Sequence, residues 1–389
     1  MHLLVNDVLM QYNKNKGCVH MKRIIENVKF MLDGTMVFGD LHLENGIVER
    51  IDYKTPHMMS DIAIPGLVDI HTHGFHGLTC ESTDKKHLHM LAKEYAKRGI
   101  TSFCPTIRAN SLSVYKTYLD AYRRAFRGDY RGARYEGTHL EGPYLHPDQC
   151  GAIKKENLQD IHLGELEDFL SEYHNDIRIM TIAPELPNAM EAISLLHLYG
   201  VEVSLGHTNA DYAQTMEAFE KGATQITHLG NTMPGIDSSK PGIMDAAFLS
   251  NCLCEIIVDG VHIQKEMLRW LIQLLGTNRV AAVSDGTLYS GFTYPNGYKL
   301  KDGSVVKNGA VYKDDILLGS IHDLLDIFQF LYEKLEYDLS SCIQMCSTNA
   351  AKMLKSYSYE IGLGRKINLV VLSHDFQIKD VIINGRSMV

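Results

Sequence analysis

Histidine and carboxylate residues recur along this chain just where short apolar runs end. The residues concerned are His71, His73, Glu141, His207, His228 and Asp285. Taken singly, such a His is usually a hydrogen-bonded structural residue, and an Asp after a strand is often a helix N-cap. Their repetition at equivalent positions of successive segments favours a shared site instead. Imidazole nitrogens and carboxylate oxygens together are typical ligands of a divalent metal ion.

The spacing and type of these residues predict how they would bind metal. His71 and His73 are two residues apart on an extended segment, so their side chains point to the same face and can bind one cation together. His207 and His228 supply two further neutral nitrogen ligands, and Glu141 supplies a carboxylate that can bridge two ions. Such mixed ligation suits zinc or ferrous iron, with one or two ions per subunit.

Asp285 has the chemistry of a proton carrier. A carboxylate beside a metal can accept the proton of a bound water as the resulting hydroxide attacks a carbonyl carbon. The same carboxyl group can then donate that proton to a departing amine. The sequence therefore predicts metal-dependent hydrolysis, with Asp285 as general base and acid and also as a metal ligand.

These residues require a scaffold that brings distant segments together. Residues 64–360 alternate strand-like apolar runs with amphipathic segments such as 85–97 and 210–221, which is typical of βα units. The expected strands are residues 64–70, 101–106, 135–140, 178–183, 202–205, 225–227, 255–258 and 280–284. Eight such units predict an α/β fold, a (β/α)8 TIM barrel, whose active site lies at the carboxyl ends of the strands.

The two ends of the chain have a different pattern. Residues 21–63 contain short strands separated by Asp33-Gly34 and Asn45-Gly46 turns, and residues 361–389 contain two more strands and an Asn384-Gly385 turn. We expect the two segments to form a small β-sandwich domain together. Residues 1–20 are expected to be a poorly structured, disordered extension.

The overall composition narrows the class of protein. Of the 389 residues, 45% are hydrophobic and 22% are charged, the balance of an ordinary globular protein. A net charge of −9 without a basic stripe argues against nucleic-acid binding. We expect no membrane span and no signal peptide, and hence a cytoplasmic protein. The 8 scattered cysteines agree with a reducing compartment.

Several motifs resemble those of the amidohydrolase superfamily. The segment PGLVDIHTHG, residues 65–74, resembles its opening motif, and HLEGPY, residues 139–144, is similar to a motif of its N-acetylglucosamine-6-phosphate deacetylase branch. In many other branches a carboxylated lysine stands in place of Glu141. Further matches in order along the chain are residues 183–185, 206–210, 227–231, 259–262, 284–286 and 347–351. The resemblance covers about residues 21–389.

The resemblance implies roles for individual residues. It implies Glu141, His207 and His228 as the main metal ligands and Asp285 as the catalytic acid and base. It places the sugar and its phosphate near a second set of residues. These substrate-binding candidates are Ala152, Asn231, Thr232, Lys240, His262, Leu318 and Gly319. The implied reaction is hydrolysis of a linear C–N amide bond in an amino-sugar phosphate by a homodimer.

Two departures from the family pattern bear on the substrate. Ser239 stands where an arginine that grips the phosphate is usual, and Lys240 can replace it only as a point charge. Ile153 follows Gly151-Ala152 where some members have a histidine that polarises the amide. N-acetylglucosamine 6-phosphate is the expected substrate. N-acetylgalactosamine 6-phosphate, another acetamido sugar, and a non-catalytic binding protein of the same fold are the alternatives.

Overall fold

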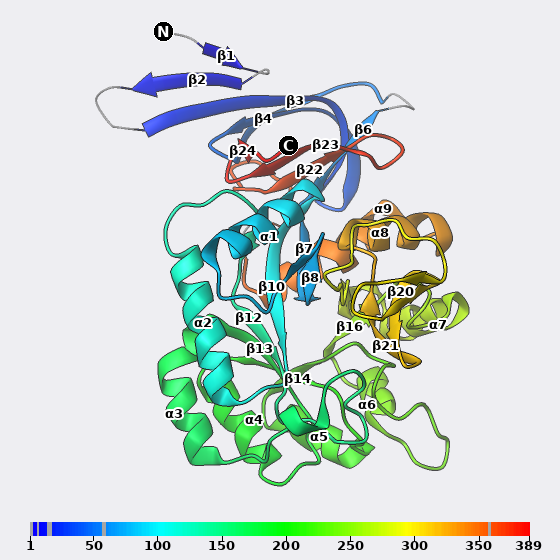
Figure 1. Cartoon of the computed structure of the whole chain (residues 1–389). Coiled ribbons are helices and arrows are strands. Elements are labelled where there is room, and N and C mark those ends of the chain that lie inside the picture. The colour runs from blue at the N-terminus through cyan, green and yellow to red at the C-terminus, as the bar shows by residue number, and fades with distance from the viewer. Residues whose placement is uncertain (1–2, 6–7, 14–17, 57–59, 357–358) are drawn as a thin grey trace.

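The computed structural model of the chain describes residues 3–5, 8–13, 18–56, 60–356 and 359–389. Within these residues, eight parallel strands form a ladder that curves round into a nearly closed barrel (Figure 1). They are β7 (Leu67–Thr72), β10 (Ile100–Arg108), β12 (Thr138–Glu141), β13 (Ile177–Ile182), β14 (Glu202–Leu205), β15 (Ala223–Ile226), β16 (Leu253–Ile257) and β17 (Val280–Val283). The predicted barrel is confirmed, with all eight expected strands present.

The barrel closes where β17 meets β7. Asp285 N donates to His71 O at 3.0 Å, and Thr72 forms a parallel bridge with Gly286. Two expected strands, residues 64–70 and 135–140, are each interrupted at a glycine. Residues 135–140 divide into β11 (Arg134–Tyr135) and β12, because Gly137 between them has a φ of 111° that interrupts the strand.

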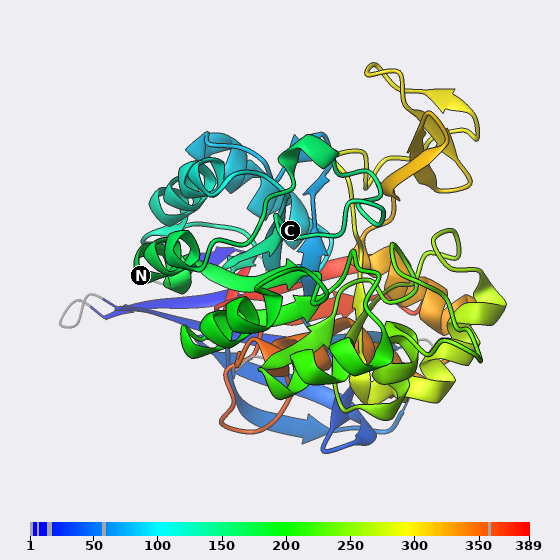
Figure 2. The same ribbon diagram turned by 90° about the horizontal axis from the view of Figure 1, so that it is seen from below.

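Helices cover the outside of the barrel, one after most strands (Figures 1 and 2). They are α1 (Lys85–Lys97), α2 (Leu112–Phe126), α3 (Leu163–Tyr173), α4 (Ala189–Leu198), α5 (Tyr212–Glu220), α6 (Ile243–Leu249), α7 (Lys265–Leu275) and α8 (Leu324–Gln329). The prediction for residues 85–97 matches α1, which buries Leu88, Leu91 and Tyr95 on one face. Helix α5 begins two residues later than expected, because Asp211 forms a capping box with Gln214.

Shorter helical segments complete the barrel wall. After α8 the chain continues through a π-helical turn (Phe330–Lys334), α9 (Leu339–Ile343), a second π-helical turn (Gln344–Thr348) and α10 (Asn349–Met353). Three 3₁₀ turns lie at Lys155–Asn157, His174–Asp176 and Thr277–Arg279. In the part of the chain that the structure describes, no helix combines the length and apolar character needed to cross a membrane.

Both chain ends contribute to a second, small β domain, as expected. Its strands are β3 (Cys18–Leu32), β4 (Thr35–Glu44), β5 (Ile47–Tyr53), β6 (Asp61–Pro65), β22 (Leu369–Leu372), β23 (Ile378–Ile383) and β24 (Arg386–Ser387). Antiparallel pairing of β6 with β22 joins the two ends. The sandwich encloses its own apolar core, which includes Phe30, Leu41, Val48, Leu369 and Ile382.

The passage from this domain into the barrel differs from the prediction. Residues 64–70 were expected to form one barrel strand, but the chain changes sheets at Gly66. Ile64 pairs with Val370 in the end domain, whereas Leu67 N donates to Gly99 O at 3.0 Å in the barrel. An added Cβ at Gly66 would lie 2.0 Å from Thr101 Oγ1, so only glycine fits this crossing.

Two short strands lie within the first residues, which the sequence predicts to be an extension. Leu3–Val5 forms β1 and Val8–Asn13 forms β2, and β2 pairs antiparallel with β3 (Figure 1). Residues 1–2, 6–7 and 14–17 lie outside the described residues. The strands extend the sheet of the end domain at its edge.

A small antiparallel sheet between β17 and α8 was not predicted. It consists of β18 (Tyr298–Lys299), β19 (Val305–Lys307), β20 (Ala310–Lys313) and β21 (Ile316–Ser320). It forms the yellow arm that projects from the barrel in Figure 2. A short hairpin of β8 (Gly74–Phe75) and β9 (Leu78–Thr79) lies after β7. Both insertions follow carboxyl ends of barrel strands, where the functional loops of such barrels lie.

Candidate active site

Three of the candidate residues occupy equivalent, strained positions after their strands. His207, His228 and Asp285 each lie two residues beyond the ends of β14, β15 and β17. Their φ angles are 50°, 31° and 44°, in the left-handed region that non-glycine residues rarely adopt. Backbone strain of this kind is typical of functional sites, where a side chain must be held in one direction. Here it turns all three side chains toward the barrel mouth.

One group of ligand atoms surrounds Glu141. Its Oε1 lies 3.1 Å from His207 Nε2 and 3.3 Å from His228 Nε2, and the two nitrogens are 3.1 Å apart. His207 Nδ1 lies 2.7 Å from the carbonyl oxygen of Gln149, where only an N–H can donate. The proton therefore sits on Nδ1, and Nε2 presents its lone pair to the cluster.

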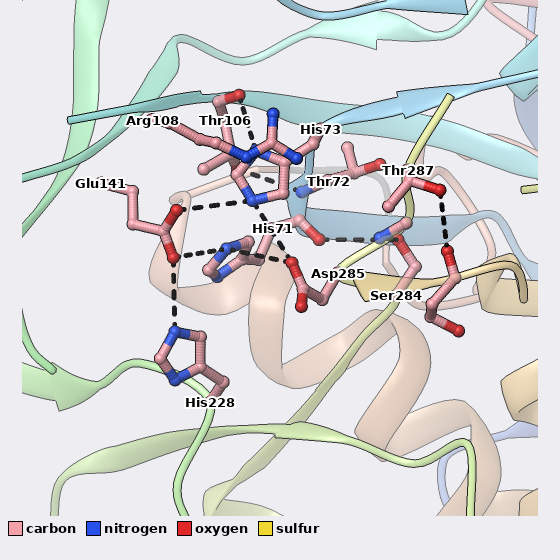
Figure 3. Close-up of polar contacts among 12 residues, drawn as sticks. His71, Thr72, His73, Thr106, Arg108, Glu141, His228, Ser284, Asp285 and Thr287 are labelled. Carbon is pink, nitrogen blue, oxygen red and sulfur yellow. Dashed lines mark hydrogen bonds and ion pairs between the residues drawn. The ribbon is translucent and has the colours of Figure 1, made fainter. Parts of the chain in front are cut away.

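A second group lies directly beside the first (Figure 3). His73 Nε2 is 3.3 Å from Asp285 Oδ1 and 3.4 Å from Glu141 Oε2. His71 Nε2 is 3.4 Å from Glu141 Oε1 and 3.7 Å from Asp285 Oδ1. Glu141 therefore lies between the two groups, with one oxygen toward the His207 side and the other toward His73.

The donor set fits bound divalent metal. His71 Nε2 is buried without a hydrogen-bond partner among the described residues. His207 and His228 aim ring nitrogens at each other, an arrangement that a cation between them would stabilise. Two sets of three residues each bring their ligand atoms within 4.8 Å of one another. The first is Glu141, His207 and His228, and the second is His71, His73 and Asp285. Both sets are nitrogen and carboxylate oxygen, as zinc or ferrous iron prefers.

Both carboxylates of the cluster, Glu141 and Asp285, carry negative charge. Burial alone would raise the pKa of Glu141, but the imidazoles of His207, His228 and His71 around its carboxylate bring it well below its usual value. Burial likewise opposes ionisation of Asp285, yet the neighbouring imidazoles of His73 and His71 lower its pKa. Two anionic carboxylates among imidazoles attract a divalent cation.

The cluster opens into a pocket of about 210 Å³. Six of the seven substrate-binding candidates line it, namely Ala152, Asn231, Thr232, His262, Leu318 and Gly319. Lys240 does not belong to this lining; it lies exposed on the loop before α6. His71 is fully buried, whereas the other five metal-ligand candidates face the pocket. Gly319 approaches Asp285 so closely that an added Cβ would lie 2.8 Å from its carbonyl oxygen.

Sequence reasoning gave no role to three polar residues of the site, although Asp259 lies within the motif at residues 259–262. Glu255 Oε2 lies 2.9 Å from His71 Nδ1, and Asp259 Oδ2 lies 2.6 Å from His262 Nδ1. Arg108 lines the pocket at the end of β10. Glu255 is the one charged residue in the apolar run LCEII, and a charged residue in such a run could have been noticed in the sequence. Arg108 was missed because the second strand was expected to end at Thr106, whereas β10 ends at Arg108. A search for polar residues at strand ends would otherwise have included it.

Fold and site together define the class of protein. The amidohydrolase family model matches residues 62–388, so the chain belongs to the amidohydrolase family. Within this family the chain is similar to enzymes that act on acetylated amino-sugar phosphates. An N-acetylglucosamine-6-phosphate deacetylase of Vibrio furnissii is 28% identical over 97% of this chain and 96% of its own length.

Two further relatives cover most of the chain. An N-acetylgalactosamine-6-phosphate deacetylase of Escherichia coli O157:H7 is 26% identical over 91% of this chain and 96% of its own. A mutant N-acetyl-D-glucosamine-6-phosphate deacetylase of Mycobacterium smegmatis, solved in complex with N-acetyl-D-glucosamine-6-phosphate, has a TM-score of 0.85. It is 26% identical and covers 95% of this chain and 99% of its own.

Proposed function

We propose that this chain hydrolyses the acetamide of N-acetylglucosamine 6-phosphate to glucosamine 6-phosphate and acetate. The observation that carries the proposal is that Glu141 joins two metal-ligand groups and lines one pocket with Asp285. The names of relatives that cover nearly the whole chain support the choice of substrate.

The chain's own residues have distinct tasks in this reaction. One or two zinc or iron ions would be held by Glu141 with His207 and His228, and by His71 and His73 with Asp285 as a further ligand. A divalent ion there lowers the pKa of a water and polarises a carbonyl group. Asp285 takes the proton from the attacking water and returns it to the leaving nitrogen.

The substrate residues divide between the two sides of the pocket. Asn231 and Thr232, which follow β15, would contact the sugar, and Leu318 and Gly319 of β21 would cover the acetyl group. His262 is oriented by Asp259 and has Nε2 3.6 Å from Asp285 Oδ2, so it would contact the sugar close to the reacting amide. Lys240 would have to move to reach a phosphate in the pocket.

N-acetylgalactosamine 6-phosphate is the second candidate substrate. Relatives named for that activity are 26% and 29% identical to this chain, close to the values for the glucosamine relatives. The two sugars differ in the configuration of one hydroxyl. An unphosphorylated acetamido sugar is the third candidate, because Ser239 replaces the usual arginine. A homodimer and a cytoplasmic location remain predictions from the sequence.

Acetate release by the metal-loaded protein tests the proposal. N-acetylglucosamine 6-phosphate should be turned over, with a higher kcat/KM than N-acetylgalactosamine 6-phosphate or N-acetylglucosamine. Asp285→Asn should lower kcat by about 10²–10⁴-fold while glucosamine 6-phosphate still binds. The exposed Asp168 on helix α3 provides the matched Asp→Asn control. No acetate release by the wild type with bound metal would overturn the proposal.

A further inference from the structure

Arg108 is a cationic residue of the catalytic pocket, and the proposed function gives it no role. Among the described residues, it is the only Lys or Arg in the pocket lining. Its guanidinium has one polar partner in the described part of the chain, a long ion pair of 3.4 Å from Nη1 to Glu81 Oε1. A guanidinium has five N–H donors, so most remain available to a ligand.

Strand register fixes the level of Arg108 in the barrel. Strand β10 lies between β7, which carries His71, and β12, which ends at Glu141. Arg108 is the Cα partner of Glu141, just as Thr106 is the partner of His139 one layer deeper. Partners in a parallel pair have side chains on the same face of the sheet. The Arg108 side chain therefore starts from the barrel strands at the same level as the metal-ligand groups.

The side chain extends along that layer. Figure 3 shows Arg108 directed toward His73, on the Glu141 and His73 side of the cluster. Glu81, in the loop after β9, also accepts a hydrogen bond from Arg108 N at 3.2 Å. Glu81 therefore holds both the backbone and the guanidinium of Arg108. About one third of the Arg108 side chain stays exposed, and the residue lines the pocket.

We propose that Arg108 is a catalytic residue that donates hydrogen bonds to the amide oxygen of the substrate. The inference rests on the proposed function, because that reaction puts a carbonyl carbon beside the metal-ligand cluster. The sugar phosphate is attached across the ring from the acetamide. A cation at the level of Glu141 therefore faces the reacting amide and not the phosphate.

The reaction builds negative charge where Arg108 lies. As the water oxygen bonds to the amide carbon, its proton passes to Asp285 and the carbonyl π pair moves onto the amide oxygen. The Arg108 N–H groups stabilise that oxyanion. The pair then returns to the C–O bond, the C–N bond breaks, and the amine nitrogen takes the proton from Asp285. Preorganised donors at an oxyanion are typically worth about 10²–10³-fold in kcat.

Substitution of Arg108 tests the assignment. Arg108→Gln should lower kcat about 100-fold on N-acetylglucosamine 6-phosphate and on N-acetylglucosamine alike, with little change in KM. Arg108→Lys keeps the charge but loses the planar fork, so its kcat should be intermediate. Bound metal and the affinity for glucosamine 6-phosphate, which lacks the amide oxygen, should stay at wild-type values. The exposed Arg127 provides the matched Arg→Gln control.

Other outcomes have definite meanings. A rise in KM confined to the phosphorylated sugar would overturn the proposal and assign Arg108 to the phosphate. Wild-type kcat in Arg108→Gln, or a loss of activity in parallel with bound metal, would also overturn it. Guanidinium added to Arg108→Ala should restore part of the lost kcat, which a folding defect would not allow. Failure of the wild type to release acetate from any of the sugars would instead overturn the proposed function, and the inference with it.

Discussion

His71 Nδ1 lies 2.9 Å from Glu255 Oε2, and both side chains are fully buried. Nδ1–H donates to the carboxylate, so the lone pair of His71 Nε2 is available to a metal ion bound beside Glu141 and Asp285. A carboxylate behind a ligating histidine fixes its tautomer and raises its basicity. Glu255 therefore belongs to the site although it does not line the pocket.

Glu255→Gln should weaken metal binding at the His71 and His73 group by about 10–100-fold, because the amide is a poorer partner for Nδ1–H. The side chain keeps its length, so the barrel core should be little disturbed. Chelator competition followed by metal analysis measures the affinity. The exposed Glu49→Gln in the end domain is the matched control. Unchanged metal affinity in Glu255→Gln would show that the contact does not tune His71.

The two metal-ligand groups should be separable by substitution. We expect the wild type to bind two ions per chain, one at each group. His73→Gln removes a ligand from the group with His71 and Asp285 and should reduce the bound metal to about one ion. His207→Gln should act on the group with Glu141 and His228. Metal analysis of the two variants measures the stoichiometry, and a wild type with a single ion would contradict the expectation.

The fold could be predicted because the apolar runs of its strands and the sequences of its tight turns are both local patterns. Apolar runs of four to nine residues mark the barrel strands, and Asp33-Gly34 and Asn45-Gly46 have the positive φ angles of tight hairpin turns. The change of sheet at Gly66 could not be predicted, because Ile64-Pro65 before it and Leu67-Val68 after it are equally apolar. Which sheet receives Ile64 depends on Val370, about three hundred positions away.

The site was predictable to the extent that its residues follow strand ends. His207, His228 and Asp285 each lie two residues past a strand, and the topology brings such positions together. Glu255 lies inside a strand, and its contact with His71 depends on the closed barrel. Lys240 was assigned by motif alignment alone, and the loop that carries it lies outside the pocket lining. Motif alignment identifies the position of a residue in the sequence, but the conformation of its loop determines whether the side chain reaches the pocket.

His322 should make stability depend on pH. Its Nδ1 lies 3.8 Å from Asp326 Oδ2, and this carboxylate raises the pKa of His322 above its ordinary value of 6.5. A raised pKa in the folded state stabilises the protein below about pH 6.5, and the stabilisation is lost as pH rises through the folded value.

The comparison of wild type with His322→Gln measures this contribution. The wild type should have the larger free energy of unfolding at about pH 5.5, by about 0.2–1 kcal/mol since solvent screens the partly exposed pair. The difference should shrink toward zero at about pH 8.5. The exposed His374→Gln serves as a control in urea unfolding at both pH values. A difference that grows with pH would contradict the assignment.

Gly66→Ala should destabilise the protein at the junction of its two domains. The new Cβ would lie 2.0 Å from Thr101 Oγ1 and 2.4 Å from Thr101 Cγ2, deep between β7 and β10. Ser347 Oγ donates to Gly66 O at 2.7 Å, so the backbone has little room to shift. Overpacking of this kind typically costs about 1–3 kcal/mol. Because β7 leads to His71 and His73, bound metal should fall together with the unfolding temperature.

A second glycine distinguishes overpacking from a general effect of Gly→Ala. Gly164 lies in the first turn of α3, and an added Cβ there would meet nothing within 4 Å. Gly164→Ala should leave the metal content unchanged and stabilise the helix by about 0.5–1 kcal/mol, since alanine loses less backbone entropy on folding. Thermal unfolding of both variants makes the test. Equal stability of Gly66→Ala and the wild type would mean that the two sheets can separate at Thr101 without cost.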